Sequence, residues 1–348
     1  MKVLVTGHHG YIGSVMSPFL HDAGLTVAGL DTFFYEGCDL AADRIDLPSA
    51  RGDVRDLGAD ALTGFDAVVH LAALSNDPLG DLNPRWTYDV NLNGTVSVAR
   101  AAKEAGVRCF VFASSCSMYG AADLGELVTE EAPLAPLTPY AESKVRAEEA
   151  LLGLADDDFS PVLMRNATVY GVSPRLRADV VLNNLVGWAF TTRTVNVLSD
   201  GTPYRPIVHV EDVARAALAL LEAPVDVIHN QAFNVGADSE NYRVSELAEI
   251  TRDTVPCSTI DYAEGAGPDP RSYRVDFGKF SRGFPEYRPR WKARDGAREL
   301  FDAYRKANLD LDTFQGDRFV RIARLKLLIE KRDLDDDLRW RQAAGAMR

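Results

Sequence analysis

The stretch Val3-Leu4-Val5-Thr6-Gly7-His8-His9-Gly10-Tyr11-Ile12-Gly13 joins a short apolar run to three evenly spaced glycines. Apolar runs of this length are typical of buried strands, and residues 12–23 suit a helix. Glycines at these places allow a tight turn, a close approach of backbone to a diphosphate and tight strand–helix packing. The backbone N–H groups of Tyr11 and Ile12, at the start of the helix, would then point toward the phosphates. The stretch therefore predicts a dinucleotide site, although its GxxGxxG spacing is one residue longer than the usual fingerprint.

Strand-type runs and helical segments alternate along the first half of the chain, which is the pattern of a parallel α/β sheet. The expected strands are 3–6, 26–30, 67–71, 109–113 and 162–165, and the expected helices are 12–23, 83–105 and 140–154. Further on we expect helices over 180–191, 213–221, 293–308 and 317–331, and strands over 207–210 and 233–235. The pattern predicts a Rossmann-type, doubly wound parallel sheet with a smaller, interleaved C-terminal lobe. The sheet domain is assigned to 1–171 and 203–235, and the substrate-binding lobe with a helical tail to 172–202 and 236–348.

Composition narrows the class of protein. The 348 residues are 46% hydrophobic and 26% charged, enough for a sizeable core, and the net charge of −13 disfavours nucleic acid and anionic membranes as partners. The four cysteines include no CxxC pair and the six histidines no HExxH spacing, so neither a disulfide framework nor a metal site is expected. No apolar stretch has membrane-spanning length, and the chain opens directly with a strand. We expect a cytoplasmic protein with reduced thiols.

Asp31 follows the second strand, about twenty residues beyond the glycine loop, where a carboxylate accepts hydrogen bonds from the adenosine ribose. No arginine stands immediately beside it in the sequence, and a 2′-phosphate would meet its like charge, so Asp31 favours NAD over NADP. His8 and His9 are expected to lie exposed at the tip of the loop.

Tyr140 and Lys144 lie one helical turn apart in the run Thr138-Pro139-Tyr140-Ala141-Glu142-Ser143-Lys144. Thr138 can cap a helix whose first residue is Pro139, so both side chains should share one face. A nearby ammonium favours the phenolate and lets the tyrosine accept a proton from a sugar hydroxyl. The pair could also be an ordinary feature of a helix surface, because this spacing is common.

Several further motifs occur in a fixed order: Asp53-Val54, His70-Leu71-Ala72-Ala73, Asn91-Leu92-Asn93-Gly94-Thr95, Ser114-Ser115-Cys116-Ser117-Met118-Tyr119-Gly120 and Asp200-Gly201-Thr202-Pro203-Tyr204-Arg205. With the glycine loop and the Tyr140–Lys144 pair, they make the chain resemble the extended short-chain dehydrogenase/reductase family over about residues 1–280. The later motifs resemble its nucleotide-sugar epimerase and dehydratase branch.

The resemblance implies NAD as cofactor and assigns residues to it. Asp53 and Val54 would contact adenine, Lys144 would hold the nicotinamide ribose, and the remaining cofactor contacts would come from Leu71, Ala72, Ala73, Asn91 and Ser114. Ser115 would bind the reacting hydroxyl, and Tyr140 would act as base and then as acid. A nucleotide-diphosphate sugar would be the substrate, bound by Ser115, Cys116, Ser117, Thr168, Arg177, Asn184, Arg205 and Arg271.

Two positions narrow the reaction. The 4,6-dehydratases of this branch carry an Asp-Glu pair where this chain has Cys116 and Ser117, and a second carboxylate is needed to eliminate water. Decarboxylases usually keep a glutamate, and 3,5-epimerases a cysteine, at the position of Ser117. Cys116 is one place earlier than that cysteine and suits a small buried residue. The chemistry favoured is 4-epimerisation, with a ketoreductase or a 4,6-dehydratase of the same family as alternatives. A non-catalytic dinucleotide sensor is disfavoured because Tyr140 and Lys144 are both present.

The sugar itself is less well specified. Thr168-Val169-Tyr170-Gly171 followed by residues 174–179 is similar to a segment of hexuronate 4-epimerases, although Val172 and Ser173 are in excess. Arg175 and Arg177 could meet a sugar carboxylate, pair with Asp179 or face solvent. A hexuronate, a neutral hexose and a heptose all stay open. The resemblance also implies a homodimer through a four-helix bundle of segments 83–105 and 140–154, and the tail after about residue 285 is expected to pack on the substrate lobe.

Overall fold

The central element is a seven-stranded, all-parallel sheet in the order β10-β6-β5-β4-β1-β2-β3. The computed structural model describes residues 1–40, 47–75, 82–121, 127–265, 267, 269 and 271–341. The strands are β1 Lys2–Thr6, β2 Thr26–Asp31, β3 Ser49–Arg51, β4 Ala67–His70, β5 Cys109–Ser115, β6 Ser160–Asn166 and β10 Gln231–Val235. This order confirms the expected doubly wound α/β class.

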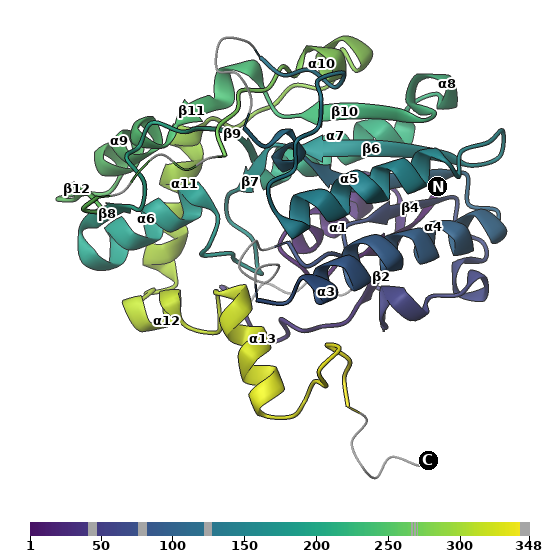
Figure 1. The fold of residues 1–348 in the computed structure, drawn as a ribbon, viewed down its shortest axis with the longest axis horizontal. Helices are drawn as coiled ribbons and strands as arrows, with labels where there is room; N and C mark the ends of the chain where they lie inside the picture. Colours follow the sequence, from purple (N-terminus) through teal and green to yellow (C-terminus); the bar gives the residue numbers. More distant parts are fainter. Residues whose placement is uncertain are drawn as a thin grey trace.

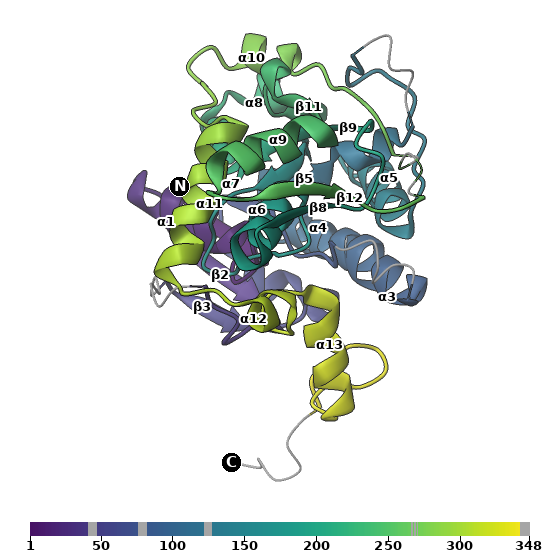
Figure 2. The ribbon, with the colours of Figure 1, turned by 90° about the vertical axis from the view of Figure 1, so that its left-hand side faces the viewer.

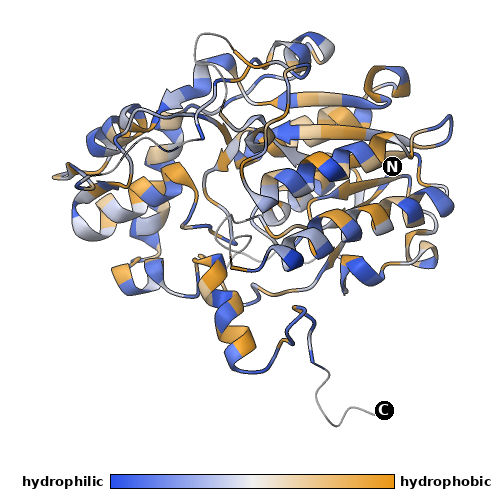
Figure 3. Cartoon of the chain, viewed as in Figure 1, coloured by the Kyte–Doolittle hydropathy of each residue, from blue (hydrophilic) through white to orange (hydrophobic). Residues whose placement is uncertain are grey.

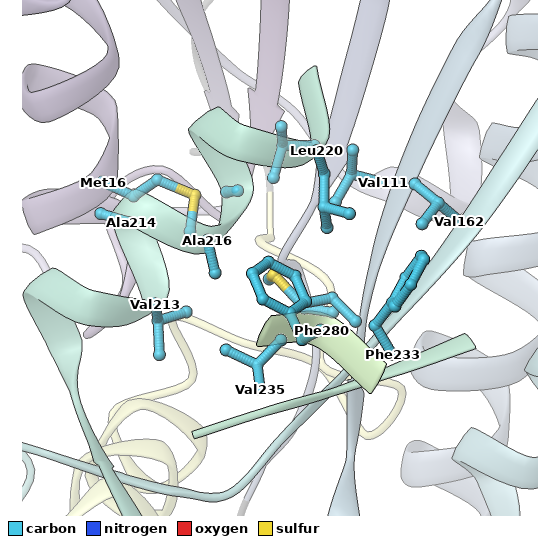
Figure 4. Close-up of a cluster of buried hydrophobic side chains, with 14 of the residues drawn as sticks. Met16, Val111, Val162, Val213, Ala214, Ala216, Leu220, Phe233, Val235 and Phe280 are labelled. Atoms are coloured by element: carbon cyan, nitrogen blue, oxygen red, sulfur yellow. The ribbon is translucent and has the colours of Figure 1, made fainter. Parts of the chain in front are cut away.

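Helices cover both faces of the sheet, and the alternation of side chains along β1 shows why (Figure 1). Val3 and Val5 point to one face, where they share a core with α1 and α7, whereas Leu4 points to the other, where it shares a core with α4 and α5. Figure 4 shows part of the first core, with Met16 of α1 beside α7. The bounds are α1 Gly13–Asp22, α7 Val210–Glu222, α4 Thr95–Glu104 and α5 Pro139–Leu152.

The helix expected over 83–105 is present but not uniform. It consists of α3 (Pro84–Thr87), a π-helical segment (Tyr88–Gly94) and α4. The wider turns of a π-helix often occur at functional sites. Here the π-helical segment contains Asn91, whose fully buried side chain bonds the backbone of Leu74 in both directions.

A second lobe is built from α6, α9 and α11 around its own apolar core. The bounds are α6 Val181–Thr192, α9 Val244–Thr254 and α11 Ala293–Lys306, with a parallel pair β8 Thr194–Val197 and β12 Thr259–Tyr262, and a three-stranded sheet of β11 Asn241–Arg243, β9 Tyr204–His209 and β7 Thr168–Tyr170. The short helices α8 Val225–Ile228 and α10 Gly278–Gly283 lie near the β10 edge. The residue boundaries proposed between the two lobes stay a prediction.

The last part of the chain differs from expectation. We call residues 311–341 the C-terminal strap; it contains α12 (Leu311–Gln315) and α13 (Arg321–Glu330). Figures 1 and 2 show the strap, in yellow, beneath the edge of the large sheet, and Figure 3 shows apolar and polar stretches alternating on α13. Leu325, Leu328, Leu334 and Leu338 pack against residues of the sheet domain, including Phe34 and Leu74. α11 packs on the second lobe as predicted, and α12 joins it there through Phe314. In contrast, α13 packs on the sheet domain, because its apolar face has its matching surface there.

No helix among the described residues combines the length and the apolar character that crossing a bilayer requires.

Candidate active site

A cavity of about 880 Å³ opens at the carboxyl ends of the parallel strands. It lies where the strand order reverses between β1 and β4, which is where open α/β sheets bind ligands. Both lobes and the strap contribute to its walls. Of the residues singled out from the sequence, the lining includes Gly7, Gly10, Tyr11, Ile12, Gly13, Asp31, Asp53, Val54, Leu71, Ala72, Ala73, Ser114, Ser115, Ser117, Tyr140, Lys144, Thr168, Arg177, Asn184, Arg205 and Arg271.

The glycine loop leaves no room for side chains. Gly7 has a φ of +75°, and a Cβ there would lie 2.7 Å from the amide nitrogen of Ala72. A Cβ on Gly13 would lie 2.2 Å from the carbonyl oxygen of Gly7. The loop thus folds tightly against the start of α1, whose positive helix end suits a diphosphate. The cradle fits the diphosphate of a dinucleotide.

Asp31 is tied to the glycine loop. One carboxylate oxygen accepts the backbone N–H of His9 at 3.0 Å and the other that of Phe33 at 2.8 Å, which leaves lone pairs for ribose hydroxyls. Burial raises the pKa of Asp31, and these two hydrogen bonds oppose the shift. Arg51 is its neighbour across the sheet but forms an ion pair with Glu36.

The prediction that both histidines lie exposed at the loop tip is wrong for His8. Its side chain is 8% exposed and lies against Gly29, where a Cβ would clash with the imidazole ring. His9 stacks near Phe33 and contacts the guanidinium of Arg175, which also pairs with Asp39. The glycine loop folds against β2 and its side chains are largely covered. Arg175 is buried with them and contacts His9, so it does not face solvent or a sugar.

The expected adenine end is built around Asp53. Its carboxylate caps a short helical turn through the N–H of Arg55 and accepts Nε and Nη2 of the same arginine at 2.9 and 2.6 Å. Burial alone would raise the pKa of Asp53, but the bonds from Arg55 outweigh it and hold the pKa below its ordinary value. The other terminal nitrogen of Arg55 donates to Asp89 and to the carbonyl oxygen of Asp337 in the strap.

Tyr140 and Lys144 share one face at the start of α5. The hydroxyl of Thr138 caps the helix by accepting the N–H of Ala141 at 3.2 Å, and Pro139 takes the first turn as predicted. Nζ of Lys144 lies 5.8 Å from the centre of the Tyr140 ring. Burial lowers the pKa of Lys144 to about 7, and the charge of Glu148 one turn further on opposes the shift. The lysine therefore titrates near neutrality.

The end of β5 supplies the hydroxyl groups of the cavity. Ser115 donates from Oγ to Oγ of Ser117 at 2.9 Å and accepts the N–H of Ser117. Ser114 donates to the sulfur of Met118 at 3.5 Å. The two hydroxyls of Ser115 and Ser117 thus form a joined pair in the lining of the cavity, which also includes Tyr140.

Two predicted site residues do not reach the cavity. Cys116 is fully buried, its thiol directed at the carbonyl oxygen of Arg165 at 3.2 Å, and burial raises its pKa. Cys116 is the first residue of the short 3-10 helix that follows β5, and its side chain packs into the core beneath the sheet. Asn91 is also fully buried; its amide bonds Leu74 and Ser143, so it holds the loop after β4 against α5.

The second lobe contributes charged groups that are already paired. Arg177 grips Asp179 and the loop residue Ser75, and Asn184 donates to the carbonyl oxygen of Ala178 at 2.8 Å. Asp269 pairs with Arg205 at 2.7 Å and with Arg271 at 2.8 Å, which brings the two predicted diphosphate ligands together around one carboxylate. Thr168 lines the wall from the start of β7.

Other lining residues had not been singled out from the sequence. Arg55 could have been found from the sequence, because an arginine two residues after Asp53 is close enough to pair with that carboxylate. Tyr35 and Arg321 also line the cavity, with the guanidinium carbon of Arg321 4.0 Å from the centre of the Tyr35 ring. No local pattern connects these two, because they meet only through the docking of the strap.

Comparison with known proteins agrees with this geometry. The model of the NAD dependent epimerase/dehydratase family matches residues 3–236. A UDP-glucose 4-epimerase of Streptomyces lividans is 35% identical over 275 residues, which is 72% of this chain and 80% of that protein. The structure of MoeE5 in complex with UDP-glucuronic acid and NAD superposes with a TM-score of 0.77 at 29% identity, covering 88% of this chain and all of that one.

A dTDP-glucose 4,6-dehydratase, DesIV from Streptomyces venezuelae, solved with NAD and TYD bound, has a TM-score of 0.76 at 25% identity and covers 88% of this chain and 97% of that chain. The similar proteins thus share the fold but catalyse more than one reaction. The family match covers well over half of the chain and includes the glycine loop, Tyr140 and Lys144. The chain therefore belongs to the NAD dependent epimerase/dehydratase family of extended short-chain dehydrogenase/reductases, and its cofactor is NAD.

Proposed function

We propose that this enzyme is a nucleotide-diphosphate-sugar 4-epimerase. It would oxidise the sugar at C4 to a transient 4-keto sugar and reduce it again on the opposite face. The observation that carries the proposal is the set of carboxylates around the cavity. Among the described lining residues these are Asp31, Asp53, Asp179 and Asp269, and each is bound by backbone amides or by arginine.

A dehydratase needs a further acid and base close to the reacting hydroxyl. At that place, beside Ser115, this chain has the hydroxyl of Ser117 and a cysteine that points away. Ser115, Tyr140 and Lys144 suffice for removing and returning a proton at one hydroxyl. This supports a reaction that needs no second carboxylate.

The roles follow from position. Ser115 holds the C4 hydroxyl, and Tyr140 accepts its proton and later gives a proton back. Lys144 orients the nicotinamide ribose and favours the phenolate of Tyr140 while it is charged. Bound NAD supplies the hydride acceptor and then the hydride donor. The paired arginines Arg205 and Arg271, with Asn184, would hold the substrate diphosphate, since an arginine fork suits phosphate oxygens.

The sugar class follows less directly. Arg177 is bound by Asp179 and Ser75, so a hexuronate would have to displace Asp179 before its carboxylate met this guanidinium. A neutral hexose or a heptose requires no such exchange. The pairing of Arg177 therefore favours a neutral sugar. Measuring the turnover of UDP-glucose and of UDP-glucuronate by the purified enzyme tests this choice.

The test uses purified enzyme and UDP- or dTDP-linked sugars deuterated at C4. An epimerase gives the 4-epimer with the deuterium retained at C4 and consumes no added NADH, because the hydride returns from the same cofactor. A ketoreductase, acting on these alcohols in its reverse direction, would release a keto sugar and form reduced cofactor in proportion to product, with the deuterium transferred to added NAD. A dehydratase would release a product lighter by one water. Either of the last two results would overturn the proposal.

Tyr140→Phe is the variant that should lose activity. We expect turnover to fall by about 10²- to 10⁴-fold, the usual contribution of a general acid–base group, while NAD stays bound. Tyr262→Phe is the control, because Tyr262 is 42% exposed and lies outside the cavity lining. Its turnover should equal that of the wild type.

We also propose that the enzyme is a homodimer joined through α4 and α5. These helices lie side by side on one face of the sheet, and Val96 and Val145 on them are only partly buried within the chain (Figure 1). Light scattering of the purified protein would contradict this proposal if it gave the mass of one chain at micromolar concentration.

A further inference from the structure

Arg321 is a buried cation with an open hydrogen-bonding position. Its side chain, at the first turn of α13, is 4% exposed and lines the cavity. Nη2 donates to the carbonyl oxygen of Arg175 at 2.7 Å, but Nη1 is buried and has no hydrogen-bond partner among the described residues. A buried charged group left without a partner loses several kcal/mol of solvation, so this position is open to an acceptor atom of a bound ligand.

Two sets of contacts place this guanidinium on the side of the glycine loop. Arg175, whose carbonyl oxygen it binds, contacts the imidazole of His9 within that loop. Ser173, two residues before, donates to the carbonyl oxygen of Tyr11 at 2.7 Å. On its other side Arg321 covers the ring of Tyr35, in the segment that follows β2 and Asp31.

Its charge also distinguishes Arg321 from the other arginines of the cavity. Arg55, Arg177, Arg205 and Arg271 each pair with an aspartate. For Arg321 no ion pair occurs within the described part of the chain, and burial lowers its pKa. An anion entering between the glycine loop and Tyr35 would therefore meet a guanidinium that has no ion-pair partner among the described residues, and an N–H donor that is not yet used.

We propose that Arg321 binds the diphosphate of the NAD cofactor, so that the C-terminal strap completes the dinucleotide site. The helix end and amides of the glycine loop hold this diphosphate from one side, and Arg321 holds it from the other. The same strap reaches the adenine end, where Arg55 donates to the carbonyl oxygens of Asp337 and Leu338. Cofactor and strap therefore stabilise each other.

A second diphosphate, that of the nucleotide sugar, has the same chemistry and must be distinguished. Binding is measured by calorimetry on full-length, NAD-free protein with NAD, ADP-ribose and adenosine, and on NAD-saturated protein with UDP. In Arg321→Gln we expect the affinities for NAD and ADP-ribose to fall by about tenfold to a hundredfold, as for loss of a charged hydrogen bond. The affinities for adenosine and UDP should not change.

Arg324→Gln is the matched control. It removes an arginine one turn further along α13 that binds the carbonyl oxygens of Phe34 and Glu36 and lies outside the cavity lining. Its NAD affinity should stay within twofold of the wild type. A loss of UDP affinity in Arg321→Gln with NAD affinity intact would assign the arginine to the substrate, and unchanged affinities for all four ligands would make it purely structural. Either result overturns the proposal.

A measurement on the wild type covers the case that Arg321→Gln does not fold. ADP-ribose should slow amide hydrogen exchange in α13, whereas adenosine, which lacks the diphosphate, should not. Equal exchange in α13 with and without ADP-ribose would refute the contact. None of these readouts requires turnover, so they succeed or fail independently of the proposed epimerisation.

Discussion

The ammonium of Lys144 on α5 donates a hydrogen bond of 2.7 Å to the carbonyl oxygen of Ala113 on β5. This bond ties the helix that carries Tyr140 to the strand that carries Ser115. Burial keeps the amine away from water and lowers its pKa to about 7. The position of the lysine thus costs the folded protein stability.

Replacing Lys144 by methionine should stabilise the NAD-free protein and abolish turnover. The pKa of Lys144 is about 7 when folded and 10.5 when unfolded, so at pH 7 the folded amine is only partly protonated and unfolding takes up about half a proton. Removing this penalty, less the lost bond to Ala113, should raise the free energy of unfolding at pH 7 by about 2 kcal/mol. Urea denaturation of wild type and variant measures the difference.

The same comparison has a defined pH dependence. Between pH 7 and 10.5 the folded protein binds fewer protons than the unfolded chain, so wild-type stability rises with pH, by at most about 1.4 kcal/mol per unit from this group. The advantage of Lys144→Met should therefore shrink from pH 7 to pH 9. Lys326→Met, an exposed position on α13, should change stability by less than about 0.5 kcal/mol at any of these values. If the stability difference between Lys144→Met and the wild type increased with pH, it would contradict the lowered pKa of Lys144.

Gly13→Ala should disrupt the dinucleotide loop. Its Cβ would lie 2.2 Å from the carbonyl oxygen of Gly7 and 2.5 Å from the Cα of His8, so the backbone must move. We expect at least tenfold weaker NAD binding by fluorescence titration. Gly58→Ala is the control, because no atom lies within 4 Å of the added Cβ and its φ is ordinary. Equal NAD affinity in the two variants would show that the loop tolerates a side chain.

Arg165→Met should strongly destabilise the protein. Arg165 on β6 is 6% exposed and grips the buried carboxylate of Glu148 on α5 at 2.6 Å. Removing one partner of a buried pair leaves an uncompensated charge, at a cost of about 3–5 kcal/mol. Arg146→Met, which breaks an exposed pair with Glu142 on the same helix, should cost about 0.3–0.5 kcal/mol. Thermal and urea unfolding measure the loss of stability in each variant. Equal losses of unfolding free energy would contradict the view that the Arg165–Glu148 pair is shielded from solvent.

Arg205→Met should weaken the binding of UDP by about tenfold to a hundredfold and leave NAD binding unchanged. Arg205 and Arg271 meet at Asp269, in the part of the cavity formed by the second lobe. Calorimetry with UDP on NAD-saturated protein measures the effect. The pattern is opposite to that expected for Arg321→Gln, so a variant that loses both ligands equally would argue that the two diphosphate sites are not separate.

The sheet and the local motifs could be predicted from the sequence because short-range pattern decides them. The run from Val3 to Gly13 contains both a strand and the turn that follows it, and Thr138 with Pro139 marks the start of α5. The helix α9 was not predicted, although Leu247, Ala248 and Thr251 are buried at helical spacing within it. The strands β8 and β12 were missed because each is only four residues long and is defined by its partner.

The errors share a physical cause: they concern side chains whose surroundings come from distant parts of the chain. The sequence alone could not reveal that His8 is covered by Gly29, that Cys116 turns toward Arg165, or that Asn91 bonds Leu74. The strap is the largest such case, because its leucines pack on Phe34 and Leu74, which lie more than 200 residues earlier.

The strap also affects how the protein is made. A chain leaves the ribosome from its N-terminus, so the strands β1 to β6 emerge long before α13. Until the final segment arrives, Phe34 and Leu74 lack the leucines that cover them in the finished protein. A nonsense mutation shortly before residue 311 would thus leave the parallel sheet intact, but with an apolar surface around Phe34 and Leu74 exposed to solvent. Such a product should be removed by quality-control proteases or aggregate, instead of persisting as a merely weakened catalyst.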